Sequence, residues 1–123
     1  MTQSKQKQKH TRERTIESYL VRKVEQAGGL CLKYYNPAQR GYPDRICIMR
    51  DSQGAPLSVW VEVKAPGRRP APLQRRRLAE LRAQGQAACW ISDESEVDEL
   101  LGVFRSYPAA ELPSVVSRYF RGL

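Results

Sequence analysis

Residues 58–64 read Ser58-Val59-Trp60-Val61-Glu62-Val63-Lys64, a run that alternates with a period of two. In a β-strand, residues two apart share a face of the sheet. The three valines are therefore expected to point to one face, and Trp60, Glu62 and Lys64 to the other. The run predicts a strand with one apolar, buried face and a charged end.

A second carboxylate precedes this strand. Pro43-Asp44 follows the turn Arg40-Gly41-Tyr42 and opens the apolar stretch Ile46-Cys47-Ile48-Met49, so Asp44 is expected at the start of a neighbouring strand. Two carboxylates near one end of a sheet, with an ammonium group beside them, can hold a hard cation and a water molecule. This pattern favours metal-dependent hydrolysis of a phosphodiester.

Hydrophobic spacing and turn residues predict the remaining elements. A first helix is expected from about Thr11 to Ala27, where Gly28-Gly29 ends it. Further helices are expected at about 72–84, after Asp93 with Glu96 at capping-box spacing, and from Pro113. Strands are expected at 30–35, 44–50, 57–64 and 87–91.

The order of these elements predicts the fold class. The first three strands should form an antiparallel meander. The strand–helix–strand step from Leu57 to Ile91 should be a right-handed crossover to a parallel position. We expect an α/β fold with an αβββαβ core, in which helices flank a small mixed sheet. Residues 11–123 are expected to form a single domain, preceded by a basic, flexible tail at residues 1–10.

The charge of the chain indicates a polyanionic partner. The formal net charge is +8, and the basic residues gather in the N-terminal segment and just after the Glu62 strand. DNA is the expected partner, and these arginines are expected to contact its phosphates: Arg40, Arg68, Arg69, Arg75 and Arg76. The alternative is a solubilising tail and an ordinary solvated helix face.

Several other classes of protein are disfavoured. No apolar run approaches the ~18 residues of a membrane span, and the N-terminus has no hydrophobic signal segment, so a cytoplasmic location is expected. The single histidine, His10, supports neither a Ser-His-Asp relay nor a histidine-ligated zinc. The sequence has no glycine-rich phosphate-binding loop, so an organic cofactor is not expected. Cys31, Cys47 and Cys89 are expected to be buried, reduced thiols.

The motif residues resemble a known family. Pro43-Asp44 followed by Glu62-Val63-Lys64 on the next strand resembles the signature of the PD-(D/E)XK nucleases, whose core has a restriction-endonuclease-like αβββαβ order. With Gln74 at the start of the following helix and Glu17 in the first helix, the set looks like the VRR-NUC branch. The resemblance runs roughly from Thr11 to Gly102.

The resemblance implies a role for each motif residue. Asp44, Glu62 and the main-chain carbonyl of Val63 would bind Mg²⁺ or Mn²⁺. Lys64 would act on the attacking water or the phosphorus. Glu17 would orient water or help a second ion, and Gln74 would order the site beside the lysine. Standalone members of the branch look like homodimeric nucleases of branched DNA, Holliday junctions especially, and a phage origin is plausible for so compact an enzyme.

Other interpretations of the same residues remain open. Asp44 could cap a turn, Glu62 and Lys64 could be an exposed cross-strand pair, and Gln74 could simply occupy a first helical turn. Glu17 could pair with Arg14 or Arg22 on the helix surface. Trp60 and Trp90 are more often packing residues than platforms for bases. The apolar side chains near the C-terminus could contact a second copy or their own domain: Val115, Val116, Tyr119 and Phe120.

Two further functions remain as alternatives. One is a nuclease of the same superfamily that prefers flaps, single strands or plain duplex. The other is a basic DNA-binding module without catalysis, although binding alone has no need of a carboxylate pair that repels phosphate.

Overall fold

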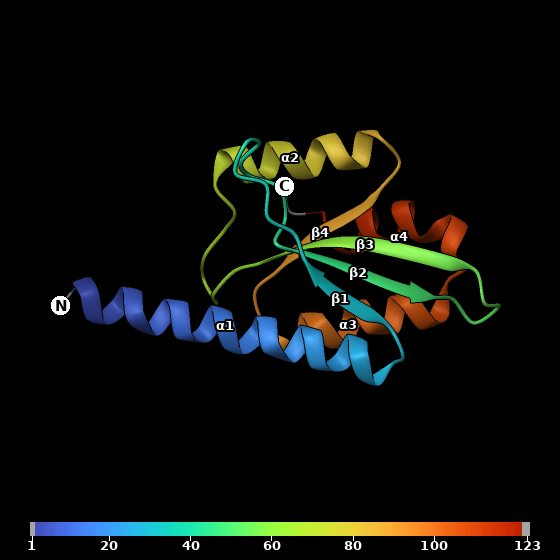
Figure 1. The fold of residues 1–123 in the computed structure, drawn as a ribbon, viewed down its shortest axis with the longest axis horizontal. Coiled ribbons are helices and arrows are strands. Elements are labelled where there is room, and N and C mark those ends of the chain that lie inside the picture. Colours follow the sequence, from blue (N-terminus) through green and yellow to red (C-terminus); the bar gives the residue numbers. More distant parts are fainter. Residues whose placement is uncertain (1, 122–123) are drawn as a thin grey trace.

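The computed structural model describes residues 2–121, with side chains described from Arg12 onward (Figure 1). Its elements follow one another in this order: α1 (Thr2–Gln26), β1 (Leu30–Lys33), β2 (Arg45–Arg50), β3 (Pro56–Val63), α2 (Pro72–Ala83), β4 (Ala87–Ile91), α3 (Glu94–Ser106), a 3₁₀ turn (Ala109–Glu111) and α4 (Leu112–Tyr119).

The four strands form one sheet in the order β1-β2-β3-β4. β1 pairs antiparallel with β2, and β2 antiparallel with β3, whereas β4 joins β3 in parallel. α2 provides the crossover between the two parallel strands. The mixed α/β fold expected from the order of the elements is confirmed.

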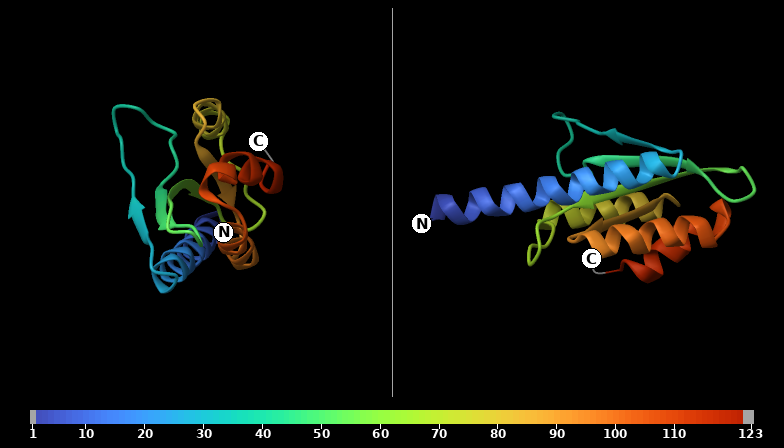
Figure 2. Two further views of the ribbon diagram at one scale, coloured as in Figure 1. Left: turned by 90° about the vertical axis from the view of Figure 1, so that its right-hand side faces the viewer. Right: turned by 90° about the horizontal axis from the view of Figure 1, so that it is seen from below.

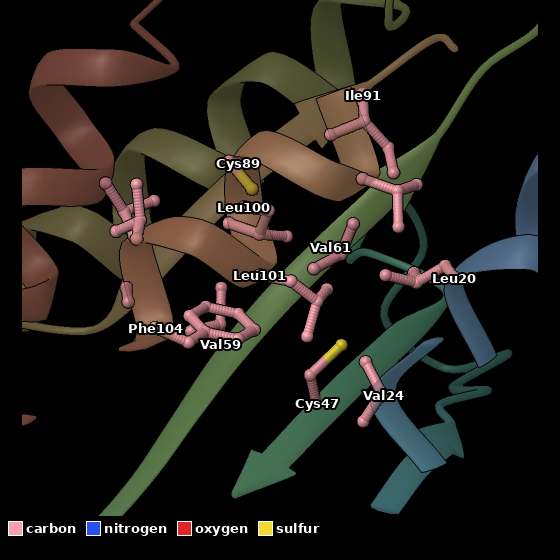
Figure 3. Packing of buried hydrophobic residues seen from close by; sticks show 14 of the residues in the cluster. Leu20, Val24, Cys47, Val59, Val61, Cys89, Ile91, Leu100, Leu101 and Phe104 are labelled. Carbon is pink, nitrogen blue, oxygen red and sulfur yellow. The ribbon is translucent and has the colours of Figure 1, made fainter. Parts of the chain in front are cut away.

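The period-two alternation of β3 separates two faces of the sheet. Val59, Val61 and Val63 are fully buried and join the hydrophobic core with side chains of α1, α3 and α4. Figure 3 shows two of these valines facing Leu20 and Val24 of α1 and Phe104 of α3. α2 lies on the opposite side of the sheet from α1 and α3 (Figure 1).

Several boundaries differ from the expectations, most of them by a single residue. α1 starts at Thr2 instead of Thr11, because the basic segment has no glycine or proline and is rich in lysine and glutamine, which form helices readily. Figure 2 shows this end of α1 projecting beyond the sheet. Whether residues 1–10 move as a tail stays a prediction, since their side chains lie outside the described part.

β1 ends at Lys33, before Tyr35, because its partner β2 begins only at Arg45, one residue after the expected Asp44.

The C-terminal helix packs on its own domain. Val115, Val116 and Phe120 are buried in the core, and of the apolar set only Tyr119 is largely exposed. The three cysteines are buried, as expected. Among the described helices none combines the length and apolar character that a bilayer crossing requires.

Candidate active site

Glu62 is the buried centre of the site. It lies near the C-terminal end of β3 on the face opposite the valines, and only 1% of its surface is exposed. Its Oε2 accepts a hydrogen bond from Gln74 Nε2 at 3.3 Å and lies 3.3 Å from Lys64 Nζ. Its other carboxylate oxygen, Oε1, is buried without a hydrogen-bond partner among the described residues. An unsatisfied buried carboxylate oxygen is costly, so this atom marks a ligand position.

The strand register places Asp44 beside Glu62. Arg45 of β2 pairs with Val61 of β3, and one further step in this antiparallel register brings Asp44 opposite Glu62. Side chains of directly opposed residues point to the same face. The site therefore gathers Asp44, Glu62 and Lys64 at one end of the sheet, on the face that carries Trp60.

The electrostatics of the two carboxylates agree with this geometry. Burial, and after it the negative charge of Asp44, raise the pKa of Glu62 to about 8 against the opposing effect of Lys64. Burial also raises the pKa of Asp44, and the charge of Glu17 contributes in the same direction. Two neighbouring acids whose pKa values are raised by burial are a suitable place for a divalent cation.

Gln74 joins the site to α2. It lies in the first turn of the helix, where its Oε1 accepts a hydrogen bond from the main-chain N–H of Ala71 at 2.8 Å. Its Nε2 donates to Glu62, as described above. One side chain thus hydrogen-bonds both the start of the helix and the buried carboxylate, and its role in ordering the site stays a prediction.

The carboxylate of Glu17 is paired with an arginine of β2. Its Oε2 accepts a hydrogen bond from Arg45 Nε at 2.7 Å, and both side chains are largely buried. This partner comes from β2, in place of the helix neighbours Arg14 and Arg22 expected for an ordinary surface pair. Arg45 directly follows Asp44 in the sequence, and the charge of Glu17 contributes to the raised pKa of Asp44.

Sequence reasoning missed Glu13, which lies one helical turn before Glu17 on α1. Its negative charge contributes to the raised pKa of Glu62. The spacing of four residues between the two glutamates was the available signal, because such residues share one face of a helix.

Sequence reasoning also missed an aromatic cluster beside the site. The ring of Tyr34 stands edge-on to Trp60, with centroids 5.1 Å apart, and to Tyr42 at 6.2 Å. Trp60 is thus a packing residue on the sheet face, as its half-buried position also indicates. Trp90 of β4, which pairs with Glu62 in the strand register, is likewise half-buried.

The predicted phosphate-binding arginines surround the same end of the sheet. Arg68 and Arg69 lie in the loop after β3, Arg76 lies in the first turns of α2, and Arg40 lies in the loop between β1 and β2, all of them exposed. Arg75 is partly buried, and its Nη1 donates to the main-chain oxygen of Pro70 at 2.9 Å.

The donor atoms fit a magnesium or manganese ion. Mg²⁺ is usually bound by one or two carboxylates and keeps several waters. Asp44 and Glu62 supply two carboxylates, and one buried oxygen of Glu62 has no partner among the side chains and main-chain groups that the structure describes. Within the described residues no group of three or more metal-ligating side chains is present. The remaining ligands would therefore be main-chain carbonyl oxygens and water.

Comparisons with known proteins identify the family. No family model matches the sequence. Over 90 residues the chain is 36% identical to p44 of Acyrthosiphon pisum secondary endosymbiont phage 1, a protein that is named for a nuclease activity. This match covers 73% of the chain and 91% of p44. A solved VRR_NUC domain superposes with a TM-score of 0.65 at 26% identity, over 74% of this chain and 95% of that domain. The chain therefore belongs to the VRR-NUC family of nucleases.

Proposed function

We propose that this protein is a Mg²⁺- or Mn²⁺-dependent endodeoxyribonuclease that cuts branched DNA, Holliday junctions in particular. One observation carries the proposal: Glu62 is buried next to Asp44 and Lys64, and one of its carboxylate oxygens has no hydrogen-bond partner in the described part of the chain. A binding module would gain nothing from buried acids beside its basic surface, since they repel phosphate. A phosphodiesterase needs them to hold a cation.

The residues divide the chemistry among them. Asp44, Glu62 and the main-chain carbonyl of Val63 would hold the ion. When bound, it supplies positive charge for the phosphoryl oxygens and lowers the pKa of water. Lys64, whose Nζ lies 3.3 Å from Glu62 Oε2, would orient the attacking water or offset the negative charge on the phosphoryl oxygens in the transition state.

Two further residues act through these groups. Gln74 holds Glu62 Oε2 by a hydrogen bond, so that Oε1 is left for the ion. We assign Glu17 the role of orienting water beside Asp44, from within its ion pair with Arg45.

The arginine set is proposed to bind the DNA backbone. Arg40, Arg68, Arg69 and Arg76 are exposed around the end of the sheet that carries the carboxylates. Arg75 contributes a second guanidinium on α2, held by Pro70. Phosphate contacts of this kind position the duplex without reading its sequence.

A panel of DNA substrates tests the proposed function. With Mg²⁺ or Mn²⁺ the purified chain is expected to cut a four-way junction at least about tenfold faster than a flap, a single strand or a linear duplex, and EDTA should abolish cutting. Faster cutting of one of the other DNAs would assign the alternative nuclease activity. DNA binding without metal-dependent cutting of any substrate would favour the non-catalytic module.

We also propose a homodimer, because symmetric cutting of a four-way junction needs two sites at a fixed separation, which a two-fold dimer supplies. Leu30, Leu32 and Ile48 support this assembly: they are exposed on one face of β1 and β2, and α2 does not cover them. The mass in solution should be that of two chains, and Leu32→Glu should halve it. A wild-type chain that remains monomeric at micromolar concentration would rule out the dimer.

DNA as the substrate agrees with a cytoplasmic, DNA-associated protein, and the phage source of p44 supports an origin in a phage or mobile element. Fluorescence of a tagged copy is expected to coincide with the DNA of the cell.

A further inference from the structure

A pocket of about 290 Å³ opens directly beside the carboxylate pair. Its walls come from the segment between β1 and β2, and they include Tyr34, Tyr35, Arg40, Tyr42 and Asp44. The volume is at the small end of the range for ligand pockets, about 300 Å³ and above. Because Asp44 belongs both to the pocket and to the proposed metal site, a group bound here would lie next to the phosphate that is cut.

A main-chain hydrogen bond joins the two ends of this segment where it leaves β1 and enters β2. The main-chain N–H of Tyr34 donates to the main-chain oxygen of Asp44 at 2.7 Å, just beyond the last paired residues of β1 and β2. The hydroxyl of Tyr34 accepts a hydrogen bond from Asn36 Nδ2 at 3.1 Å, and its ring packs edge-on against Trp60. One wall of the pocket is thus fixed to the sheet.

The opposite wall is seated on α2, which the segment approaches in Figure 1. Gly41 has a φ of +93°, and a Cβ atom there would lie 2.8 Å from Leu73 Cγ, so only glycine allows this approach. The guanidinium of Arg77 lies 4.7 Å from the centre of the Tyr42 ring, and Arg77 Nε donates to the main-chain oxygen of Arg40 at 2.9 Å. Walls that are held in this way need little ordering when a ligand binds.

Two side chains of the pocket remain available to a ligand. Tyr35 is 81% exposed, and within the described part of the chain no hydrogen bond or ring contact engages its side chain. The side chain of Arg40 is also exposed. An aromatic ring and a guanidinium together are the groups that proteins use to stack nucleobases and to bind the adjoining phosphate.

We propose that this pocket receives an unpaired nucleobase adjacent to the cleaved phosphate, stacked on Tyr35, while Arg40 contacts a neighbouring phosphate. The inference rests on the proposed function and specifies the part of the substrate that it recognises. A base inside an intact duplex has both faces covered by its neighbours and cannot enter. A base that is unpaired at a branch point or in a bulge is free to do so, and the pocket thus gives the enzyme its means of distinguishing branched DNA from plain duplex.

Binding to a fluorescent base analogue tests this inference without any cutting. The probe is 2-aminopurine, whose emission falls when it stacks, placed either as a single bulged nucleotide or fully paired in an otherwise identical duplex. The protein is the full chain carrying Glu62→Gln. We expect it to bind the bulged duplex about tenfold more tightly than the paired one and to quench the bulged base.

Three variants in the same background complete the test. Tyr35→Ala should remove the preference and the quenching, whereas Tyr35→Phe should keep both. Tyr119→Ala, which removes another exposed tyrosine that lies on α4 and does not line the pocket, should change neither. Equal affinity for the two duplexes, or a preference that survives Tyr35→Ala, would overturn the inference. Failure of the nuclease proposal would be recognised separately, as absence of metal-dependent cutting by the unmodified chain.

Discussion

Replacement of Glu62 by glutamine, or of Lys64 by alanine, is expected to slow metal-dependent DNA cutting by about 1,000-fold. Glutamine keeps the shape of the buried side chain but removes the charge that would hold the ion. Alanine at position 64 removes the ammonium group that lies 3.3 Å from Glu62. Each loss corresponds to several kcal/mol of transition-state stabilisation. Single-turnover rates on a four-way junction with Mg²⁺ measure the effect directly.

Further variants distinguish Glu62 and Lys64 from the residues that are proposed to orient the groups around them. Gln74→Ala is expected to cost about 10- to 100-fold, the usual effect of losing a residue that orients a metal ligand. Glu17→Gln should cost less than Glu62→Gln, because the Glu17 carboxylate is occupied by Arg45. Glu99→Gln removes an exposed carboxylate of α3 and should leave the rate unchanged. Undiminished cutting by Glu62→Gln or Lys64→Ala, with folding and DNA binding intact, would refute the catalytic assignment.

The affinity for Mg²⁺ is expected to rise about tenfold for each pH unit between pH 6 and pH 8 and to level off above. The metal-free protein holds a proton on Glu62, since burial and the nearby Asp44 charge raise the pKa of this side chain to about 8. An incoming cation must displace that proton, and the displacement becomes easier as the pH rises. Titration calorimetry at several pH values gives the slope.

The same proton affects the stability of the metal-free protein. Above the ordinary glutamate pKa the unfolded chain has lost this proton while the folded protein keeps it, so rising pH up to about 8 lowers the contribution of Glu62 to the free energy of unfolding. Mg²⁺ should offset this loss, and in Glu62→Gln both the pH slope and most of the Mg²⁺ effect should disappear. A Mg²⁺ affinity that is flat from pH 6 to pH 8 would contradict the raised pKa.

The sequence predicted the parts of the site that depend on the alternation of side chains along a strand. Alternation in β3 placed Glu62 and Lys64 opposite the valine face, and Pro43 marked the start of the neighbouring strand next to Asp44. The antiparallel pairing of consecutive strands then brought the two acids together, because a short meander leaves few alternatives for the register. The αβββαβ order was predictable for the same reason.

Contacts between distant segments were not predictable in this way. The partner of Glu17 is Arg45, 28 residues away, whereas helical spacing suggests only Arg14 and Arg22. The aromatic pocket depends on the approach of Gly41 to α2, which no local pattern encodes. For α4, an apolar stripe predicts burial but does not specify the surface that covers it, and the structure shows that this surface is the protein's own core.

A single divalent ion shared by Asp44 and Glu62, within reach of Lys64, is the central claim. Anomalous diffraction from crystals grown with Mn²⁺ tests it most directly, because the signal locates the ion independently of any assumed ligand. We expect a peak at the end of β3 that contacts both carboxylates and the main-chain carbonyl of Val63. A protein that cuts DNA with Mn²⁺ but binds the ion away from these two side chains would contradict the claim.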